Sequence, residues 1–479
     1  MVLQVIKSVR SSILAFSVAI LLPALANAEN LADAMADAYE HSGLLQQNRA
    51  LLRAADEGVA QTYASLRPIL NWYGAIEHAF GTSSSFSTGG VSSAINTSNA
   101  SIGISLQILL FDNGQSKNLI EAAKETVLST RQSLIIAEQS VLFDAVQSFM
   151  NVVRDTQIVE LRQNNLRLVE RELQAAQDRF EVGEVTRTDV AQAEASLAGG
   201  RADLARAQGD LMQSQEFYSA AIGHRPGRLN APRRLPNVPV AMEDAKAVAI
   251  RSHPSMIRAQ YDISTAEYNV LAAESAMGPR VTLDGQYAIQ EDINTRYHNH
   301  AGTIGLTLGG PIYQGGRLSS VLRQAMALRD GERANLHVVR HTTRQNAGNA
   351  WAALATSKAQ LVATGRQVEA ARVAFEGVRE EAKLGARTTL DVLIAEQALL
   401  DAEANRITAS TDQFTAAYAL LASMGLLTTE HLNLKVERYD PLAYYDAVKD
   451  APALLSERGK KLDKVLRALG KSDTVIGKE

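Results

Sequence analysis

The chain has 479 residues, no cysteine, 5% aromatic residues and a formal net charge of −4. The lack of cysteine excludes disulfides, thiolate metal sites, a catalytic thiol and a lipid-modified cysteine. A mildly acidic chain without basic clusters is not expected to bind nucleic acid. Long stretches built from Ala, Gln, Glu, Leu and Arg favour long helices over several compact cores.

Residues 1–28 have the pattern of a signal peptide. Lys7 and Arg10 precede an apolar stretch from Ile13 to Leu25, and Ala26-Asn27-Ala28 fits the small-x-small cleavage pattern. Removal of the two positive charges would give a mature net charge of −4 − 2 = −6. No later segment reaches the roughly 18 apolar residues that a membrane-spanning helix needs. We therefore expect an exported protein without a transmembrane helix.

The chain contains two similar halves. Leu31-Ala-Asp-Ala34 matches Met242-Glu-Asp-Ala245 at an offset of 242 − 31 = 211, and Phe111-Asp-Asn-Gly114 matches Tyr313-Gln-Gly-Gly316 at 313 − 111 = 202. We expect a signal peptide (1–28), a first structural repeat of short helix, hairpin and long helix-turn-helix (29–223), a connector (224–241), a second repeat (242–425) and a C-terminal segment (426–479).

Long helices are expected after the hairpin of each half. No proline occurs from residue 69 to 225 or from 312 to 440, and within these spans apolar residues recur at helical spacing. The pattern predicts helices over about 115–181, 188–222, 317–383 and 390–424. The first helix of each pair would be about 100 Å long.

Four shorter segments alternate between apolar and small or polar residues. Ile102, Ile104, Leu106 and Ile108 follow this period of two, as do Leu70 to Ile76, Val281 to Tyr287 and Thr303 to Leu308. We expect two hairpins, the first with a Ser/Gly-rich loop from 81 to 99, the second turning near 294–299. A half-buried sheet of a soluble sandwich has the same alternation. Export favours a membrane barrel, in which one face is apolar.

Four strands are too few to close a barrel, for which eight is the usual minimum. Two copies of the chain would give eight strands and an interior filled by side chains. Three copies would give twelve strands and a wider lumen. An open conduit therefore favours three copies.

These features together resemble TolC-type outer-membrane efflux and type I secretion channel proteins, from the mature start to about Gly425. The resemblance is carried by "LADA" and "MEDA", by the prolines before the first strand of each half, by "LFDNGQ" and "IYQGGR", and by "VGEVTRTDV" and "LGARTTLDV". It implies a mostly α fold with a membrane β-barrel, formed as a homotrimer with twelve strands and continued by a long periplasmic helical barrel.

The resemblance also implies the setting of the protein. The barrel would lie among lipids of the outer membrane of a Gram-negative bacterium, and the helices would extend into the periplasm. There they would dock to a periplasmic adaptor (membrane fusion) protein of an inner-membrane transporter of the ABC, RND or a similar class. Beyond the residues that carry the resemblance, we expect residues 426–479 to form an equatorial segment and a periplasmic tail, and we expect the Lys-rich end from Ser456 to be mobile. The sequence has no Gly-x-x-x-x-Gly-Lys-Ser/Thr motif. We expect neither an enzyme nor a cofactor.

The turns between the paired long helices have a structural explanation. Gly183 and Gly385 suit the left-handed position that ends a helix. Asp189 follows Thr186, and Asp391 follows Thr388, at the spacing of a capping box. The family resemblance adds a role, because the corresponding turns form the periplasmic entrance. By resemblance Asp391 matches an entrance aspartate, and Asp189 and Arg387 match a charged pair that holds the entrance shut.

The sequence departs from the family pattern at two places near these turns. Ile394 stands where well-known relatives have a second aspartate, and Ala382 stands in place of a tyrosine. We therefore expect a lighter latch of Asp189, Arg387 and Asp391. By resemblance, adaptor contacts are expected at the tips, formed by Val182, Gly183, Glu184, Leu384, Gly385 and Ala386.

Other functions have weaker support in the sequence. His298 with His300, and His337 with His341, have spacings that could bind metal. Neither pair has a third ligand nearby in sequence, so no metal site is expected. An exported coiled-coil stalk or spacer of the cell envelope would also be long and Ala-rich. It would not need four alternating strands.

Overall fold

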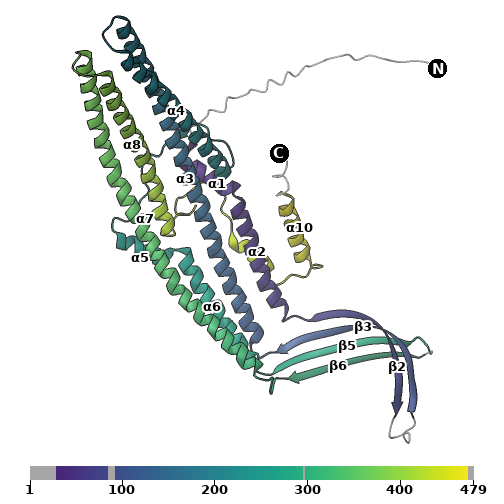
Figure 1. The fold of residues 1–479 in the computed structure, drawn as a ribbon. Helices are drawn as coiled ribbons and strands as arrows, with labels where there is room; N and C mark the ends of the chain where they lie inside the picture. Colours follow the sequence, from purple (N-terminus) through teal and green to yellow (C-terminus); the bar gives the residue numbers. More distant parts are fainter. Residues whose placement is uncertain (1–28, 85–91, 295–296, 473–479) are drawn as a thin grey trace, which may run out of the picture.

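The computed structural model describes residues 29–84, 92–294 and 297–472. The expected signal peptide lies outside the described residues. The molecule is long, with the tips of two helical hairpins at one end and a curved sheet at the other (Figure 1). None of the helices in the described ranges combines the length and the apolar character needed to cross a lipid bilayer.

The elements of the two halves of the chain follow one another in the same order and have similar lengths. The first half consists of β1 (Glu29–Asn30), α1 (Leu31–His41), α2 (Gly43–Ala64), β2 (Ile69–Ser84), β3 (Ser92–Phe111), α3 (Gln115–Glu181) and α4 (Arg187–Ile222). The predicted connector contains β4 (Leu229–Asn230), which pairs with β1. The second half consists of α5 (Met242–Ser252), α6 (Pro254–Ser275), β5 (Arg280–Asp292), β6 (His298–Gly309), α7 (Arg317–Lys383) and α8 (Thr389–Ser423). Helices α3 and α7 each have 67 residues.

The two 67-residue helices, α3 and α7, each begin at a sharp turn that follows a strand, and we call them the rods. Gly114 and Gly316 precede α3 and α7 with φ of 88° and 82°, a conformation that glycine adopts without steric cost. Asp112 stabilises the first turn, because its carboxylate accepts hydrogen bonds from the backbone N–H of Gly114 at 3.2 Å and of Ser116 at 2.7 Å. The motifs "LFDNGQ" and "IYQGGR" therefore contain the turns that lead the chain from the sheet into the helices.

The sheet has the order β2-β3-β5-β6, with all neighbours antiparallel. Trp72 lies opposite Ile104, and Ile104 lies opposite Tyr287, so the three side chains share one face. This face is apolar and exposed in the single chain: Trp72 is 79% and Ile304 is 85% exposed. The other face carries polar or small residues such as Ser105. The predicted two-sided alternation is confirmed.

The expectation of a long first loop is wrong. Strand β2 extends to Ser84 and β3 begins at Ser92, and their pairing runs from Ile69 opposite Gln107 to Ser84 opposite Ser92. Only residues 85–91, which are not described, lie between the strands. A β-ladder is made by backbone hydrogen bonds, so a Ser-, Thr- and Asn-rich segment can continue it.

The main core joins the two halves at the middle of the rods. It includes the fully buried side chains of Phe149 on α3, Tyr218 on α4 and Leu420 on α8. Helix α9 (Pro441–Val448) packs on α2, where the Tyr444 hydroxyl donates to Glu57 Oε1 at 2.8 Å. This part of the C-terminal segment therefore packs against α2.

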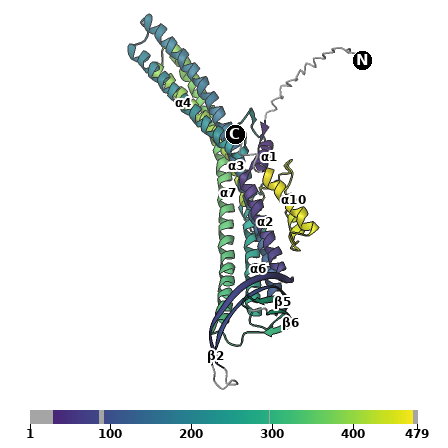
Figure 2. The ribbon, with the colours of Figure 1, turned by 90° about the vertical axis from the view of Figure 1, so that its right-hand side faces the viewer.

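The C-terminal tail, which was expected to be mobile from Ser456, contains a helix. Residues Glu457–Ser472 form α10, which lies beside α2 in both ribbon views (Figures 1 and 2). The Lys-rich composition predicts a solvated segment, but Leu462, Val465 and Leu466 recur at helical spacing among the charges. This amphipathic pattern accounts for the helix.

Candidate functional site

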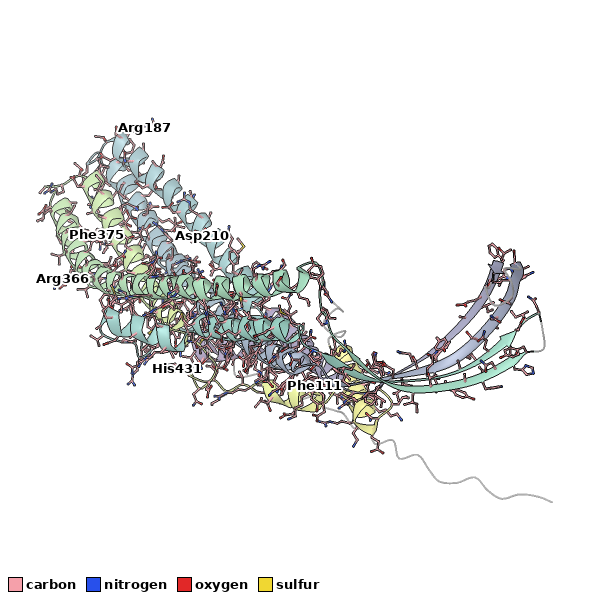
Figure 3. All side chains as sticks on the ribbon, turned by 90° about the horizontal axis from the view of Figure 1, so that it is seen from below. Phe111, Arg187, Asp210, Arg366, Phe375 and His431 are labelled. Atoms are coloured by element: carbon pink, nitrogen blue, oxygen red, sulfur yellow. The ribbon has the colours of Figure 1, made fainter. Side chains whose placement is uncertain are left out.

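The tips of the two helical hairpins lie together at the end of the molecule opposite the sheet. Figure 3 labels Arg187 at the α3–α4 tip and Phe111 where the helices meet the strands. A cleft of about 660 Å³ lies between the two tips and is lined from both sides, with Glu184, Thr186 and Asp189 from one hairpin and Arg379, Arg387 and Thr388 from the other. The predicted entrance residues Asp189 and Arg387 therefore line the same cleft.

Both turns have the same backbone structure. Gly183 and Gly385 each have φ of 78°. The N–H of Glu184 donates to the carbonyl of Arg179 at 2.9 Å, and the N–H of Ala386 donates to the carbonyl of Glu381 at 2.9 Å. These are the long-range bonds of a Schellman motif, which satisfy carbonyls at the end of a helix. The structural role expected for the two glycines is confirmed.

The two aspartates close capping boxes. Asp189 Oδ2 accepts from the N–H and the hydroxyl of Thr186 at 2.8 and 2.7 Å. Asp391 Oδ2 accepts from the same two groups of Thr388, both at 2.9 Å. These hydrogen bonds favour the charged form and lower the pKa of both aspartates. Both tips therefore carry a fixed negative charge at neutral pH.

Arg387 has a partner within its own chain that the sequence pattern does not predict. Its Nε donates to Glu381 Oε2 at 2.9 Å, and this hydrogen bond raises the pKa of the guanidinium. Within one chain, then, Arg387 pairs with Glu381 while Asp189 is held by Thr186. The Schellman turn explains this pairing. The hydrogen bond from the N–H of Ala386 to the carbonyl of Glu381 holds the residues after the turn close to the last turn of α7, where Glu381 lies. Turn geometry could have identified this pair in the sequence.

The residues at the summit of each turn are exposed. Val182 is 71% and Leu384 is 86% exposed, although both are apolar. An added Cβ at Gly183 or Gly385 would meet no heavy atom within 4 Å. Each turn therefore exposes one apolar side chain, and the glycine next to it has free space where a Cβ would lie.

The comparisons with known proteins agree with this architecture. Residues 34–224 and 247–426 match the family model described as "Outer membrane efflux protein". The chain belongs to the outer membrane efflux protein family. It is 34% identical to the outer membrane efflux protein BepC of Brucella suis over 88% of this chain and 91% of that one. It is 26% identical to the outer membrane protein TolC of Vibrio cholerae over 84% of this chain and 92% of that one.

A solved structure shows the same fold. The outer membrane channel CmeC of Campylobacter jejuni superposes with a TM-score of 0.74, covering 88% of this chain and 89% of that one at 16% identity. Membership of the outer membrane efflux protein family places this protein in the outer membrane as a channel subunit, with helices that extend into the periplasm. The family consists of transport channels rather than enzymes.

One buried polar contact below the tips in this efflux protein is not evident from the sequence. Asn165 Nδ2 of α3 donates to Glu396 Oε1 of α8 at 2.6 Å, and Glu396 is only 4% exposed. The two residues are 396 − 165 = 231 positions apart. They follow no motif, so only the packing of α3 against α8 brings them together. The contact joins the first hairpin to the second.

Proposed function

We propose that three copies of this chain form one continuous conduit from the periplasm to the cell exterior. Each copy contributes four strands to a twelve-stranded barrel among the lipids of the outer membrane and four long helices to a periplasmic barrel. A periplasmic adaptor and an inner-membrane transporter of the ABC, RND or a similar class would deliver small molecules or proteins to the tips. Energy for export would come from that transporter.

The observation that carries this proposal is the unfinished sheet. One face is apolar and exposed, and the outer strands β2 and β6 each have a neighbour on one side only within the described residues. Open strand edges carry unpaired N–H and C=O groups, which are costly in a lipid environment. Closure by further copies would satisfy these edges and place the apolar face against lipid.

Three copies are favoured over two by the width of the lumen. An eight-stranded barrel is filled by its own side chains, whereas twelve strands leave space inside. The polar face of the sheet, with Ser105, Gln107 and Asp284 in adjacent strands, would line that space. Gln107 Nε2 donates to Asp284 Oδ1 at 3.2 Å across this face.

At the tips, Asp189, Arg387 and Asp391 form the proposed entrance latch. Threefold symmetry would repeat Asp391 around a narrow opening, where a ring of carboxylates attracts cations. The lowered pKa of Asp391 supports this, since the side chain stays charged at neutral pH. Arg387 would join the closed state by exchanging Glu381 for an aspartate of the neighbouring hairpin.

The adaptor contacts are proposed at Val182, Gly183 and Glu184 of the first tip and at Leu384, Gly385 and Ala386 of the second. The exposed Val182 and Leu384 offer apolar surface, and the glycines leave room for a partner backbone. Bulky substitutions of Glu184 and Ala386 are expected to abolish export while trimers still reach the outer membrane. Normal export by such variants would contradict the contact.

The proposal is tested by planar-bilayer conductance of the purified mature protein, with the oligomer mass measured in detergent. Discrete channels from a trimer are expected. Asp391→Asn should reduce cation preference, because an amide oxygen can still accept from Thr388 but carries no charge. Thr388→Ala is the matched variant that weakens the cap and keeps the charge, so it should leave cation preference unchanged. A non-conducting monomer or dimer would instead favour an envelope stalk.

The latch has its own test in the same recordings. Arg387→Ala and Asp189→Asn should increase conductance and antibiotic entry into cells if these residues hold the entrance shut. Glu381→Gln frees Arg387 from its partner in the same chain and should not open the channel. Unchanged conductance in both Arg387→Ala and Asp189→Asn would show that the latch lies elsewhere.

A further inference from the structure

Three potential metal ligands meet where the first repeat begins and ends. Glu29 lies in β1, Asp37 lies on α1, and His224 follows α4. One ligand atom from each of the three lies within 4.8 Å of the other two. Among the described residues, neither His298 with His300 nor His337 with His341 belongs to a group of three such ligands.

The imidazole of His224 is held with one nitrogen toward the carboxylates. Its Nδ1 lies 3.1 Å from the carbonyl oxygen of Arg225, which can only accept a hydrogen bond. Nδ1 therefore carries a proton, and in the neutral ring Nε2 is left with a lone pair. Nε2 lies 3.3 Å from Asp37 Oδ2 and 3.7 Å from Glu29 Oε1. In the neutral ring three acceptors therefore face one another, and a positive charge between them, either a proton on Nε2 or a bound metal ion, removes this repulsion.

The spacing of these atoms fits a tetrahedral metal ion. Zinc binds nitrogen and oxygen ligands at about 2.0–2.1 Å, so neighbouring ligand atoms of a tetrahedral site lie about 3.3–3.4 Å apart. The distances from His224 Nε2 to the two carboxylates, 3.3 and 3.7 Å, are close to this separation. One imidazole and two carboxylates would balance the charge of a divalent ion. Their exposure would leave a fourth position for water.

The surroundings hold these ligands in place. The hydroxyl of Tyr218, a fully buried residue, donates to Glu29 Oε1, and the Tyr218 ring lies edge-on to the His224 ring with centroids 5.8 Å apart. The N–H of Glu29 donates to the carbonyl of Arg228 at 3.0 Å. Metal ligands are typically oriented by such hydrogen bonds from surrounding groups.

Close packing of α1 on the end of α4 brings the ligands together. Gly223 has φ of 99°, and an added Cβ there would lie 2.4 Å from Cγ of His41. Only glycine permits both this conformation and this approach. The site therefore depends on the same turn that ends the first repeat.

We propose that Glu29, Asp37 and His224 bind one zinc ion per chain. A single imidazole with two carboxylates suits a transition-metal ion better than magnesium or calcium, which prefer oxygen ligands alone. The ion would fasten the beginning of the described chain to the end of the first repeat, across 224 − 29 = 195 positions. Such a link would stabilise the fold by closing a long loop.

The test is zinc binding by the full-length mature trimer, purified without a histidine tag and stripped with a chelator. Addition of zinc salt alone should give one tightly bound ion per chain by metal analysis and calorimetry, and should raise the apparent unfolding temperature. Cobalt in place of zinc should give the intense visible absorption of a four-coordinate ion. His224→Ala should weaken binding roughly tenfold or more, at least the loss caused by removing a supporting group.

Asp37→Asn provides a second ligand variant in case His224→Ala does not fold, because Asp37 is exposed on α1. The control is His337→Ala combined with His341→Ala, which removes two histidines from α7 and should bind zinc as the unaltered protein does. If both ligand variants bind zinc as tightly as this control, or if the unaltered protein binds none, the proposal is overturned. In that case a protonated His224 would provide the positive charge between the two carboxylates.

Discussion

Glu396 is an ionisable residue buried between two rods. Burial raises the pKa of its carboxyl from 4.5 to about 7; the charge of Glu172 adds to this effect and Arg379 opposes it. Oε1 accepts from Asn165, whereas Oε2 has no hydrogen-bond partner in the described residues. Because the folded-state pKa lies above the ordinary value, the carboxyl contributes most to stability below about pH 4.5. This contribution is lost as the pH rises toward 7.

Glu396→Gln should therefore stabilise the protein at pH 8 and have little effect at pH 4.5. The amide oxygen can still accept from Asn165, and the cost of a buried charge, up to about 3 kcal/mol for a shift of this size, is removed. Thermal unfolding of both proteins across this pH range measures the difference. The exposed Glu376 on α7 offers a control, since Glu376→Gln should change stability little at either pH. An equal effect of Glu396→Gln at both pH values would contradict the assignment.

Two glycines of the second hairpin should respond in opposite directions to the same substitution. Gly385→Ala forces an alanine into a left-handed conformation, at a cost of about 1–2 kcal/mol, although the added Cβ meets no neighbour. Gly377→Ala lies inside α7, also in open space, and should stabilise the helix by roughly 0.5–1 kcal/mol. Hydrogen exchange of the α7–α8 hairpin should become faster at the tip in the first variant and slower in the second. Slower exchange at the tip in Gly385→Ala would show that the turn does not require glycine.

At the scale of elements, the sequence predicts the ends of helices well where the residues at those ends determine the backbone conformation. The bounds of α3 and α7 agree with the expected 115–181 and 317–383, because flanking glycines and the lack of proline define them. The two capping boxes are also predicted correctly, because they depend only on residues three positions apart. The long continuation of β2 and β3 was not, because a ladder of backbone bonds leaves little trace in a Ser-rich segment. The pairs Asn165–Glu396 and Glu29–His224 depend on packing between distant segments.

The C-terminal segment offers an element-scale prediction based on two truncations. Helix α9 is anchored on α2 and α3: the Tyr444 hydroxyl donates to Glu57 of α2, and the Arg131 guanidinium of α3 lies 5.5 Å from the centroid of the Tyr445 ring. Helix α10 is tied to this region by Arg458, which donates to the carbonyl of Asp446 at 2.6 Å. A chain that ends at residue 456 should unfold near the temperature of the full chain. One that ends at 440 should unfold several degrees lower, and equal temperatures would contradict the anchoring role of α9.

At the scale of the whole molecule, the four-stranded sheet is incomplete in a way that a threefold assembly would complete. The sheet curves strongly along its length (Figure 2), and its edges β2 and β6 lie at opposite sides of the strand order. A curved sheet with two open edges can close on copies of itself. In a closed trimer, β2 of each copy would pair with β6 of the next. This contact is specific enough to test by cross-linking.

Ala75→Cys in β2, combined with single cysteines scanned along β6, should produce covalent trimers. The chain has no native cysteine, so any cross-link must join the two introduced residues. Ala75 lies on the polar face, and Ala301, Thr303, Gly305 and Thr307 share that face through the paired register. A disulfide requires Cα atoms within about 7 Å, so only one of these positions, or two adjacent ones, should react.

The same strand provides the control, because successive residues point to opposite faces. Gly302→Cys and Ile304→Cys place the thiol on the apolar face and should leave monomers after oxidation, even though each is next in sequence to scanned polar-face positions. Non-reducing gels should show species up to three chains and none larger, since a closed ring has no free edge. Species that end at two chains would indicate an eight-stranded barrel. No cross-link at any polar-face position would show that β2 and β6 do not meet, and would remove the structural basis for a closed conduit.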